Sequence, residues 1–173
     1  MPREIETTVT HLEMRARPHI RSSMPHGKLA LIRAETPPVH FYRYLYNTIG
    51  HAYFWVNRHV MDDQALLKII HHDQVHILVL HVNGVPAGFA ELDLRKQTAP
   101  DLAFLGLMAE FQGQGLGRFL LNAVIETAWM RHPEKLTVQT CTLDHPRALR
   151  LYQRNGFTPV RQSHVTLTVP DDF

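Results

Sequence analysis

The chain has 173 residues, of which 45% are hydrophobic and 20% are charged. This length and composition predict a globular protein of one domain with its own core, and they exclude a disordered chain. The net charge of +2 is compatible with a small anionic ligand, whereas a nucleic-acid-binding protein would be expected to carry a denser basic stripe.

The apolar runs and the single cysteine indicate the cellular compartment in which the protein is expected. The longest purely aliphatic run, Ile77–Leu80, is far shorter than a membrane span requires, and the N-terminus contains arginines but no apolar core typical of a signal peptide. Cys141 is the single cysteine, so no internal disulfide can form. We therefore expect a cytoplasmic protein that binds neither membrane nor nucleic acid.

The first fifty residues are expected to contain an N-terminal segment, a strand and a helix. Residues 1–27 are rich in Arg and His and are expected to form an arm or an extra strand, ahead of a single domain over residues 28–173. After a strand at 28–35, Thr36 is a candidate N-cap for a helix that is expected to end at Gly50.

The remaining elements follow from hydrophobic periodicity. Asn83-Gly84 is the strongest hairpin turn dipeptide and separates two strand-like runs. The pattern predicts a mixed α/β fold, in which helices cover both faces of one central sheet of six to seven strands. In chain order we expect a helix at 62–72, strands at 75–82, 85–95 and 101–109, a helix at 116–130, a strand at 135–143, a helix at 145–155 and a strand at 160–169.

Three glycines at alternate positions, Gly113, Gly115 and Gly117, lie between a predicted buried strand and a predicted amphipathic helix. Glycine in a first helical turn costs backbone entropy, so either a tight turn or a ligand that approaches the backbone should compensate for it. Unpaired N–H groups at a helix N-terminus favour an anion such as a diphosphate. Arg118 favours the ligand, because helix polarity disfavours a cation at this end.

Two common phosphate-binding motifs do not fit this turn. A Walker loop requires Gly-Lys followed by Ser or Thr, but Gly117 is followed by Arg118 and Phe119. The dinucleotide-binding fingerprint fits poorly as well, because Arg118 stands where its third glycine would be and the turn comes late in the chain.

Two segments resemble the GCN5-related N-acetyltransferase (GNAT) superfamily. The turn Gln112-x-x-Gly115-x-Gly117 is similar to the signature Gln/Arg-x-x-Gly-x-Gly/Ala, and it also follows a buried strand and begins the third main helix. The segment from His145 to Phe157 resembles the helix Asn-x-x-Ala-x-x-x-Tyr-x-x-x-Gly-Phe, with histidine in place of asparagine. The resemblance implies a sheet that is splayed between the strands flanking the third helix.

The resemblance also implies acetyl-CoA as co-substrate and acetyl transfer to an amine by direct attack. Backbone amides of the glycine turn would hold the diphosphate, and an N–H of Leu107 or Met108 would polarise the thioester carbonyl. The residues that the resemblance assigns to the co-substrate are Leu107, Met108, Ala109, Gln112, Gly113, Gln114, Gly115, Leu116, Gly117, Arg118, His145 and Ala148.

Three residues are implied for catalysis. Tyr152 matches the tyrosine that the family uses as general acid at the leaving thiolate, and the alternative is a core tyrosine. Glu91 and Asp101 rank equally as the base that deprotonates the amine, and each could instead be a strand-end carboxylate facing solvent. His145 could contact the co-substrate or cap its helix beside Asp144.

The acceptor and the assembly are left open. An amine-bearing small molecule or peptide could lie against an aromatic wall, and a homodimer is compatible with the chain. No metal is expected, because His71-His72-Asp73 is interpreted as a polar helix end. The alternative function is a non-catalytic CoA-binding sensor or assembly module. The candidate wall residues are Phe41, Tyr42, Tyr44, Tyr46, Tyr53, Phe54 and Trp55.

Overall fold

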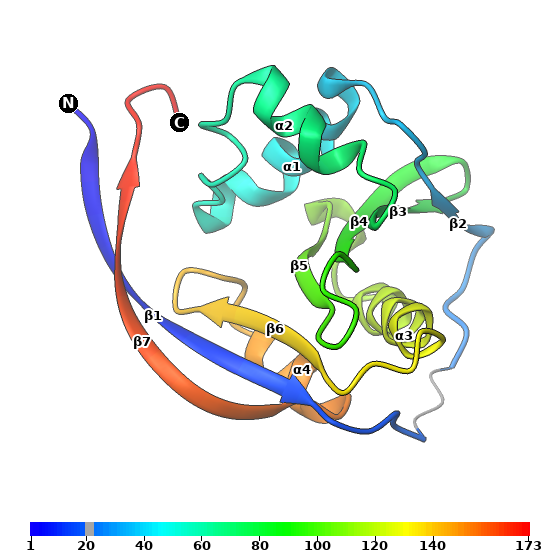
Figure 1. The fold of residues 1–173 in the computed structure, drawn as a ribbon. Helices are drawn as coiled ribbons and strands as arrows, with labels where there is room; N and C mark the ends of the chain where they lie inside the picture. The colour runs from blue at the N-terminus through cyan, green and yellow to red at the C-terminus, as the bar shows by residue number, and fades with distance from the viewer. Residues whose placement is uncertain (20–22) are drawn as a thin grey trace.

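The computed structural model describes residues 1–19 and 23–173, so residues 20–22 of the predicted N-terminal segment lie outside the described residues. Within the described residues, seven strands form one mixed sheet and four α-helices cover its two faces, which confirms the predicted α/β class (Figure 1). The strands are β1 (Arg3–Met14), β2 (Leu29–Arg33), β3 (Val75–Val82), β4 (Val85–Asp93), β5 (Asp101–Leu107), β6 (Leu136–Cys141) and β7 (Thr158–Val169). The helices are α1 (Val39–Gly50), α2 (Asp63–Ile70), α3 (Leu116–Trp129) and α4 (Ala148–Arg154), with short 3-10 turns η1 (His51–Tyr53) and η2 (Ala109–Phe111).

The strand order in the sheet is β2-β3-β4-β5-β6-β1-β7. Every neighbouring pair is antiparallel except β5 and β6, which are parallel. The turn between β3 and β4 has positive φ at Asn83 (52°) and Gly84 (82°), as a two-residue hairpin turn requires, which confirms the predicted hairpin. β1 lies between β6 and β7, so residues 3–14 form an interior strand of the sheet.

Two hydrophobic cores lie on opposite faces of this sheet. Successive strand residues point to opposite sides. Val75, Ile77 and Val79 of β3 therefore pack with residues of α1 and α2. Leu78 and Leu80 pack with residues of α3 and α4. This division gives each pair of helices one face of the sheet.

The helix ends follow local sequence signals except at the starts of α1 and α4; α4 begins at Ala148, three residues after its predicted start. Thr36 is not the N-cap of α1: it has φ of 44°, and Pro38 occupies the cap position before Val39. Proline is well tolerated at a helix start because the N–H it lacks would have no intrahelical partner. Asp62 caps α2 and accepts the Ala65 N–H at 2.8 Å. Within the described residues, every helix lacks the length and apolar character needed to cross a bilayer.

Candidate functional site: the splayed strands and the glycine turn

β5 and β6 are in contact only at the beginning of β5. The pairing involves Asp101 and Leu102, and beyond them the two ribbons separate (Figure 1). β5 also carries one extra residue, Ala103, relative to its other neighbour β4. A bulge of this kind bends and twists its strand. The bulge thus turns the second half of β5 away from β6, and among residues 1–19 and 23–173 no strand pairs with the edge of that half.

The direction of the β5 amides follows from its register with β4. Met108 N–H donates to Ala87 C=O at 2.8 Å, so this N–H is already bonded within the sheet. In an antiparallel ladder, hydrogen-bonded pairs alternate with pairs whose main-chain groups point outward. Leu107, which is opposite Gly88, therefore directs its N–H away from β4 and toward the splay, by which we mean the region where β5 and β6 separate. Of the two donors expected for a thioester carbonyl, Leu107 is the one that faces the splay.

The glycine turn joins η2 to α3 and has the geometry that glycine alone adopts easily. Gly113 and Gly115 both have φ of 78°. A Cβ placed on either residue would meet no atom within 4 Å, so the space beside the turn is open. Gly115 is the N-cap of α3, and neither a side-chain cap nor an acidic residue satisfies the first-turn N–H groups. This turn fits a diphosphate, because it combines free amide donors, open space and the positive end of α3.

The polar side chains of the turn do not all face this space. Gln112 donates its side-chain amide to the Tyr53 hydroxyl at 3.0 Å, and Gln114 donates to the Glu110 carbonyl at 3.4 Å. Arg118 is exposed in the first turn of α3. Gln112 thus links the turn to η1, a contact that the sequence did not predict.

The β6–α4 connection lies on the other side of the splay. Asp144 accepts the Thr140 hydroxyl at 2.7 Å and the Cys141 N–H at 3.0 Å through one carboxylate oxygen. The His145 ring accepts the Arg147 N–H at 3.1 Å through Nδ1. This bond lies ahead of α4, whose N-cap is Arg147 and which has no side-chain cap, so His145 does not cap the helix. Ala148 begins α4 and packs against the core beside it.

Tyr152 is 6% exposed and packs edge-to-face against Phe157, with 5.8 Å between ring centroids. Burial raises the pKa of its hydroxyl, and the negative charges of Asp144 and Asp101 raise it further. Those two carboxylates come from opposite sides of the splay. Tyr152 therefore keeps its proton at neutral pH, and its ring belongs to the hydrophobic core, as the alternative of a core tyrosine predicts.

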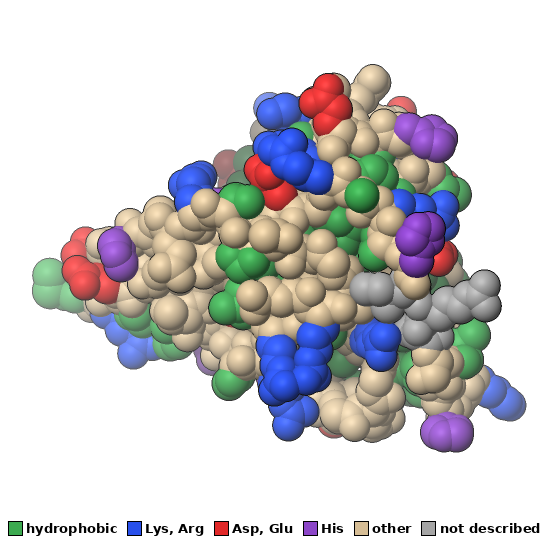
Figure 2. Space-filling view, turned by 90° about the horizontal axis from the view of Figure 1, so that it is seen from below, with side chains coloured by type: hydrophobic (Ala, Val, Ile, Leu, Met, Phe, Trp, Pro, Cys, Tyr) green, Lys and Arg blue, Asp and Glu red, His purple; other side chains and the backbone are tan. Residues whose placement is uncertain are grey.

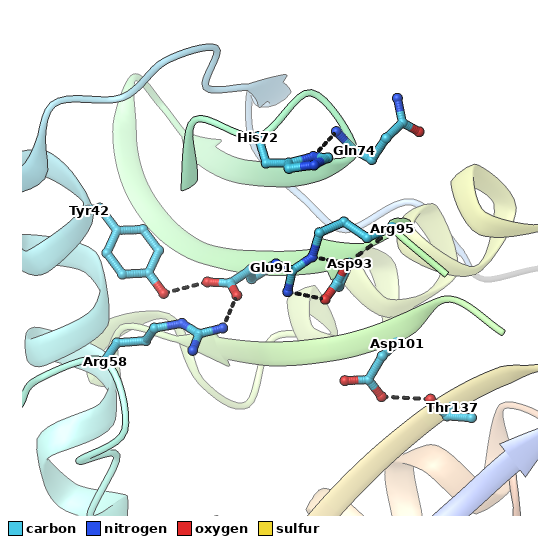
Figure 3. Close-up of polar contacts among 9 residues, drawn as sticks. All are labelled: Tyr42, Arg58, His72, Gln74, Glu91, Asp93, Arg95, Asp101 and Thr137. Carbon is cyan, nitrogen blue, oxygen red and sulfur yellow. Dashed lines mark hydrogen bonds and ion pairs between the residues drawn. The ribbon is translucent and has the colours of Figure 1, made fainter. Parts of the chain in front are cut away.

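Glu91 is completely buried and held by two partners (Figure 3). The Tyr42 hydroxyl donates to one carboxylate oxygen at 2.5 Å, and Arg58 donates to the other at 2.7 Å. Burial raises the pKa of Tyr42 well above its usual value, and the charge of Glu91 adds to this effect. The carboxylate of Glu91 is thus enclosed in a Tyr42–Glu91–Arg58 triad and does not face solvent.

Asp101 lies at the point where β5 and β6 separate. Its Oδ1 accepts the Thr137 hydroxyl of β6 at 2.6 Å (Figure 3). Burial raises the pKa of Asp101; the Thr137 hydrogen bond opposes this, and the nearby negative charges of Asp93 and Glu91 add to the increase. A carboxyl group with a raised pKa is a better proton acceptor near neutral pH than an ordinary aspartate.

Aromatic residues after α1 connect the two sides of the splay. Trp55 donates its indole N–H to Asp144 at 3.4 Å, and the Tyr53 ring lies 6.0 Å from the His145 ring. Trp55 also covers β5, where a Cβ on Gly106 would lie 3.0 Å from the indole. Part of the predicted aromatic wall is core, since Tyr42 and Tyr46 are fully buried.

Sequence reasoning did not single out Arg58. It lies between α1 and α2, is only 15% exposed, and has its guanidinium 5.3 Å from the centre of the Phe104 ring. A signal for a buried ion pair was present in the sequence: Arg58 follows an aromatic segment, and Glu91 occupies a position in a largely apolar strand. Within the described residues, no group of three or more His, Cys, Asp or Glu side chains could hold a metal ion.

The comparison with protein families identifies the class of protein to which this chain belongs. The chain belongs to the acetyltransferase (GNAT) family, whose model matches residues 42–157. The matched region contains the splayed strands, the glycine turn and α4.

One relative is similar over part of the chain. A 70-residue segment is 39% identical to the mycothiol acetyltransferase of Jonesia denitrificans. The segment makes up 40% of this chain and only 22% of that protein. The similarity thus concerns a minor part of the relative's length.

Several solved structures share the fold at low sequence identity. A putative GNAT acetyltransferase from Novosphingobium aromaticivorans aligns with 97% of this chain and 67% of its own, at 18% identity and a TM-score of 0.64. The ribosomal-protein-S18-alanine N-acetyltransferase of Escherichia coli aligns over 82% and 94%, at 18% identity and a TM-score of 0.64. An aminoglycoside acetyltransferase from an uncultured soil metagenomic sample aligns over 73% and 86%, at 17% identity and a TM-score of 0.59.

Proposed function

We propose that the protein transfers the acetyl group of acetyl-CoA to a primary amine by direct attack. The observation that carries this proposal is the combination of an open, uncapped glycine turn with an unpaired edge of β5 directly before it. A diphosphate suits the turn, and an extended pantetheine suits the edge of a strand. Membership of the GNAT family supports the same reaction.

In this proposal, main-chain groups bind and polarise the co-substrate. The amides from Gly113 to Gly117 hold the diphosphate, and the Leu107 N–H donates to the thioester oxygen. The charge that develops on this oxygen during attack is stabilised by a donor whose direction is fixed by the β-ladder. Removal of a single donor of this kind typically costs about 10²–10³ in turnover.

Proton transfer in this proposal involves Tyr152 and Asp101. Tyr152 keeps its proton at neutral pH and donates a hydrogen bond, and then the proton, to the leaving thiolate, although its raised pKa makes it a weaker acid than an ordinary tyrosine. Asp101 is the better candidate for the base, because both oxygens of Glu91 already accept hydrogen bonds from Tyr42 and Arg58. Asp101 and Leu107 lie at opposite ends of β5, roughly 15–20 Å apart along the strand, so Asp101 would take the proton through a chain of water molecules. Glu91 then acts by fixing the positions of Tyr42 and Arg58 through the hydrogen bonds that it accepts from them.

The acceptor is proposed to be an amine that arrives as an ammonium group. Two carboxylates, Glu91 and Asp93, lie close enough to Asp101 for their charges to raise its pKa, so three carboxyl groups are clustered here. Two nearby arginines, Arg58 and Arg95, compensate for part of this charge. The remaining negative charge and the partly exposed rings of Tyr53 and Trp55 favour a cationic acceptor over an anionic one.

The test is release of free thiol from acetyl-CoA across a panel of amino acids, polyamines, aminoglycosides and short peptides. Tyr152→Phe should lower turnover by about 10²-fold or more while it leaves the Kd for acetyl-CoA within about twofold of wild type, as expected for a general acid. Equal losses in turnover and affinity would instead identify Tyr152 as a packing residue. Tight acetyl-CoA binding without thiol release on any acceptor would favour the non-catalytic CoA-binding module.

A further inference from the structure

Four exposed arginines lie around the glycine turn on the side of α4. Arg147, Arg150 and Arg154 are spaced three and four residues apart, so their side chains lie along one face of the α4 segment. Arg118 is exposed in the first turn of α3. Within residues 1–19 and 23–173, none of these four arginines forms a salt bridge.

α4 is adjacent to the glycine turn. A Cβ placed on Gly117 would lie 3.9 Å from Leu151 Cδ2, so α4 contacts α3 at its first turn. Arg147 lies about one helical turn before Leu151 and Arg154 about one turn after it, while Arg150 immediately precedes it. The three arginines therefore flank the point at which α4 meets the turn.

The charge around the turn is asymmetric. Glu110, which precedes the turn in η2, is exposed and negative, whereas the α4 side carries positive charge. Figure 2 shows Lys and Arg side chains gathered on the face seen from below, the side on which α4 lies in Figure 1. Like charges three and four residues apart destabilise a helix slightly. An anion bound between the arginines would remove this repulsion.

We propose that Arg147, Arg150 and Arg154 bind the 3′-phosphate of the CoA moiety and make the protein selective for CoA over 3′-dephospho-CoA. The inference rests on the proposed function, since it requires the diphosphate to lie in the glycine turn. In CoA, the adenosine 3′-phosphate and the pantetheine are attached on opposite sides of the diphosphate. When pantetheine extends inward along β5, the 3′-phosphate therefore emerges at the outer surface. Guanidinium groups bind phosphate through charge-assisted hydrogen bonds.

The test is calorimetric titration of CoA and of 3′-dephospho-CoA into the full chain. Wild type should bind CoA about tenfold more tightly, the value expected for a charge-assisted contact that is partly exposed. The variant Arg147→Ala/Arg150→Ala/Arg154→Ala should bind both compounds with the affinity of wild type for 3′-dephospho-CoA. Arg161→Ala is the matched control, because Arg161 is exposed on β7 and should leave the tenfold preference intact.

A second measurement checks the electrostatic origin of this preference. The preference of wild type should fall several-fold between about 0.05 M and about 0.5 M salt, because exposed charges are screened. Two outcomes would overturn this inference: equal affinities of wild type for the two compounds, or a preference for CoA that survives the triple substitution. In both cases the binding of CoA would leave the proposed function standing. A protein that binds neither compound would contradict both proposals.

Discussion

Removal of the Arg58 guanidinium should destabilise the protein strongly, because it leaves the Glu91 carboxylate buried with one partner. The two side chains are 15% and 1% exposed, and their charged atoms are 2.7 Å apart. Loss of one partner from a buried ion pair costs about 3–5 kcal/mol, and the lower value applies because Arg58 is partly exposed. Arg58→Met should therefore lower the free energy of unfolding by about 3 kcal/mol, which corresponds to about 6–12 °C in Tm for a chain of this size.

The assay is urea unfolding, and the control is an ion pair whose charged atoms are equally far apart but more exposed. Arg95 and Asp93 are also 2.7 Å apart, but their side chains are 42% and 24% exposed. Arg95→Met should cost less than about 1 kcal/mol, as exposed pairs do. Combining Arg58→Met with Glu91→Gln should recover part of the loss, since the uncompensated charge is then absent. Equal losses for Arg58→Met and Arg95→Met would refute the reasoning that burial of Glu91 determines the cost.

Two further predictions concern the glycine turn and the half-buried His76. In urea unfolding, Gly115→Ala should lower the free energy of unfolding by about 1–2 kcal/mol, because φ is 78° at this position. Gly117→Ala would make only ordinary contacts at 3.7 and 3.9 Å, so it should be neutral or stabilising by up to about 1 kcal/mol. A larger loss for Gly117→Ala than for Gly115→Ala would contradict the role assigned to φ. Burial lowers the pKa of His76 to about 4, and the positive charges of Arg33 and Arg131 contribute to the shift. An unfolded histidine binds its proton near pH 6.5, so stability should be lost as the pH falls from about 6.5 to about 4. His76→Asn should reduce the dependence of the urea midpoint on pH in that range, and an unchanged slope would exclude this contribution.

The glycine turn could be predicted from the sequence because its conformation is a local property. Gly113 and Gly115 adopt positive φ, which other residues disfavour, and Asn83-Gly84 forms its turn for the same reason. The splay of β5 from β6 was expected from the family resemblance, and the pairing confirms it at the described residues. The Thr36 cap was wrong, because the position of Pro38 determines where α1 begins.

The partners of the polar side chains could not be predicted in the same way. Gln112 was expected beside a diphosphate, yet its amide bonds to Tyr53, which is 59 residues away in the chain. Glu91 and Asp101 were indistinguishable as strand carboxylates. They differ in the structure because Tyr42 and Arg58 surround Glu91, whereas Asp101 bonds only to Thr137 within the described residues.

The sequence by itself determined the backbone chemistry of this protein: which residues turn, which alternate between two faces of a sheet, and where amide donors stay unpaired at the start of α3. These properties depend on neighbours within a few positions. Tertiary structure decided which carboxylate is enclosed, which amide of β5 faces the splay, and that residues 3–14 lie inside the sheet. Those outcomes depend on groups far apart in the chain, because burial and ion pairing are set by the elements that pack together.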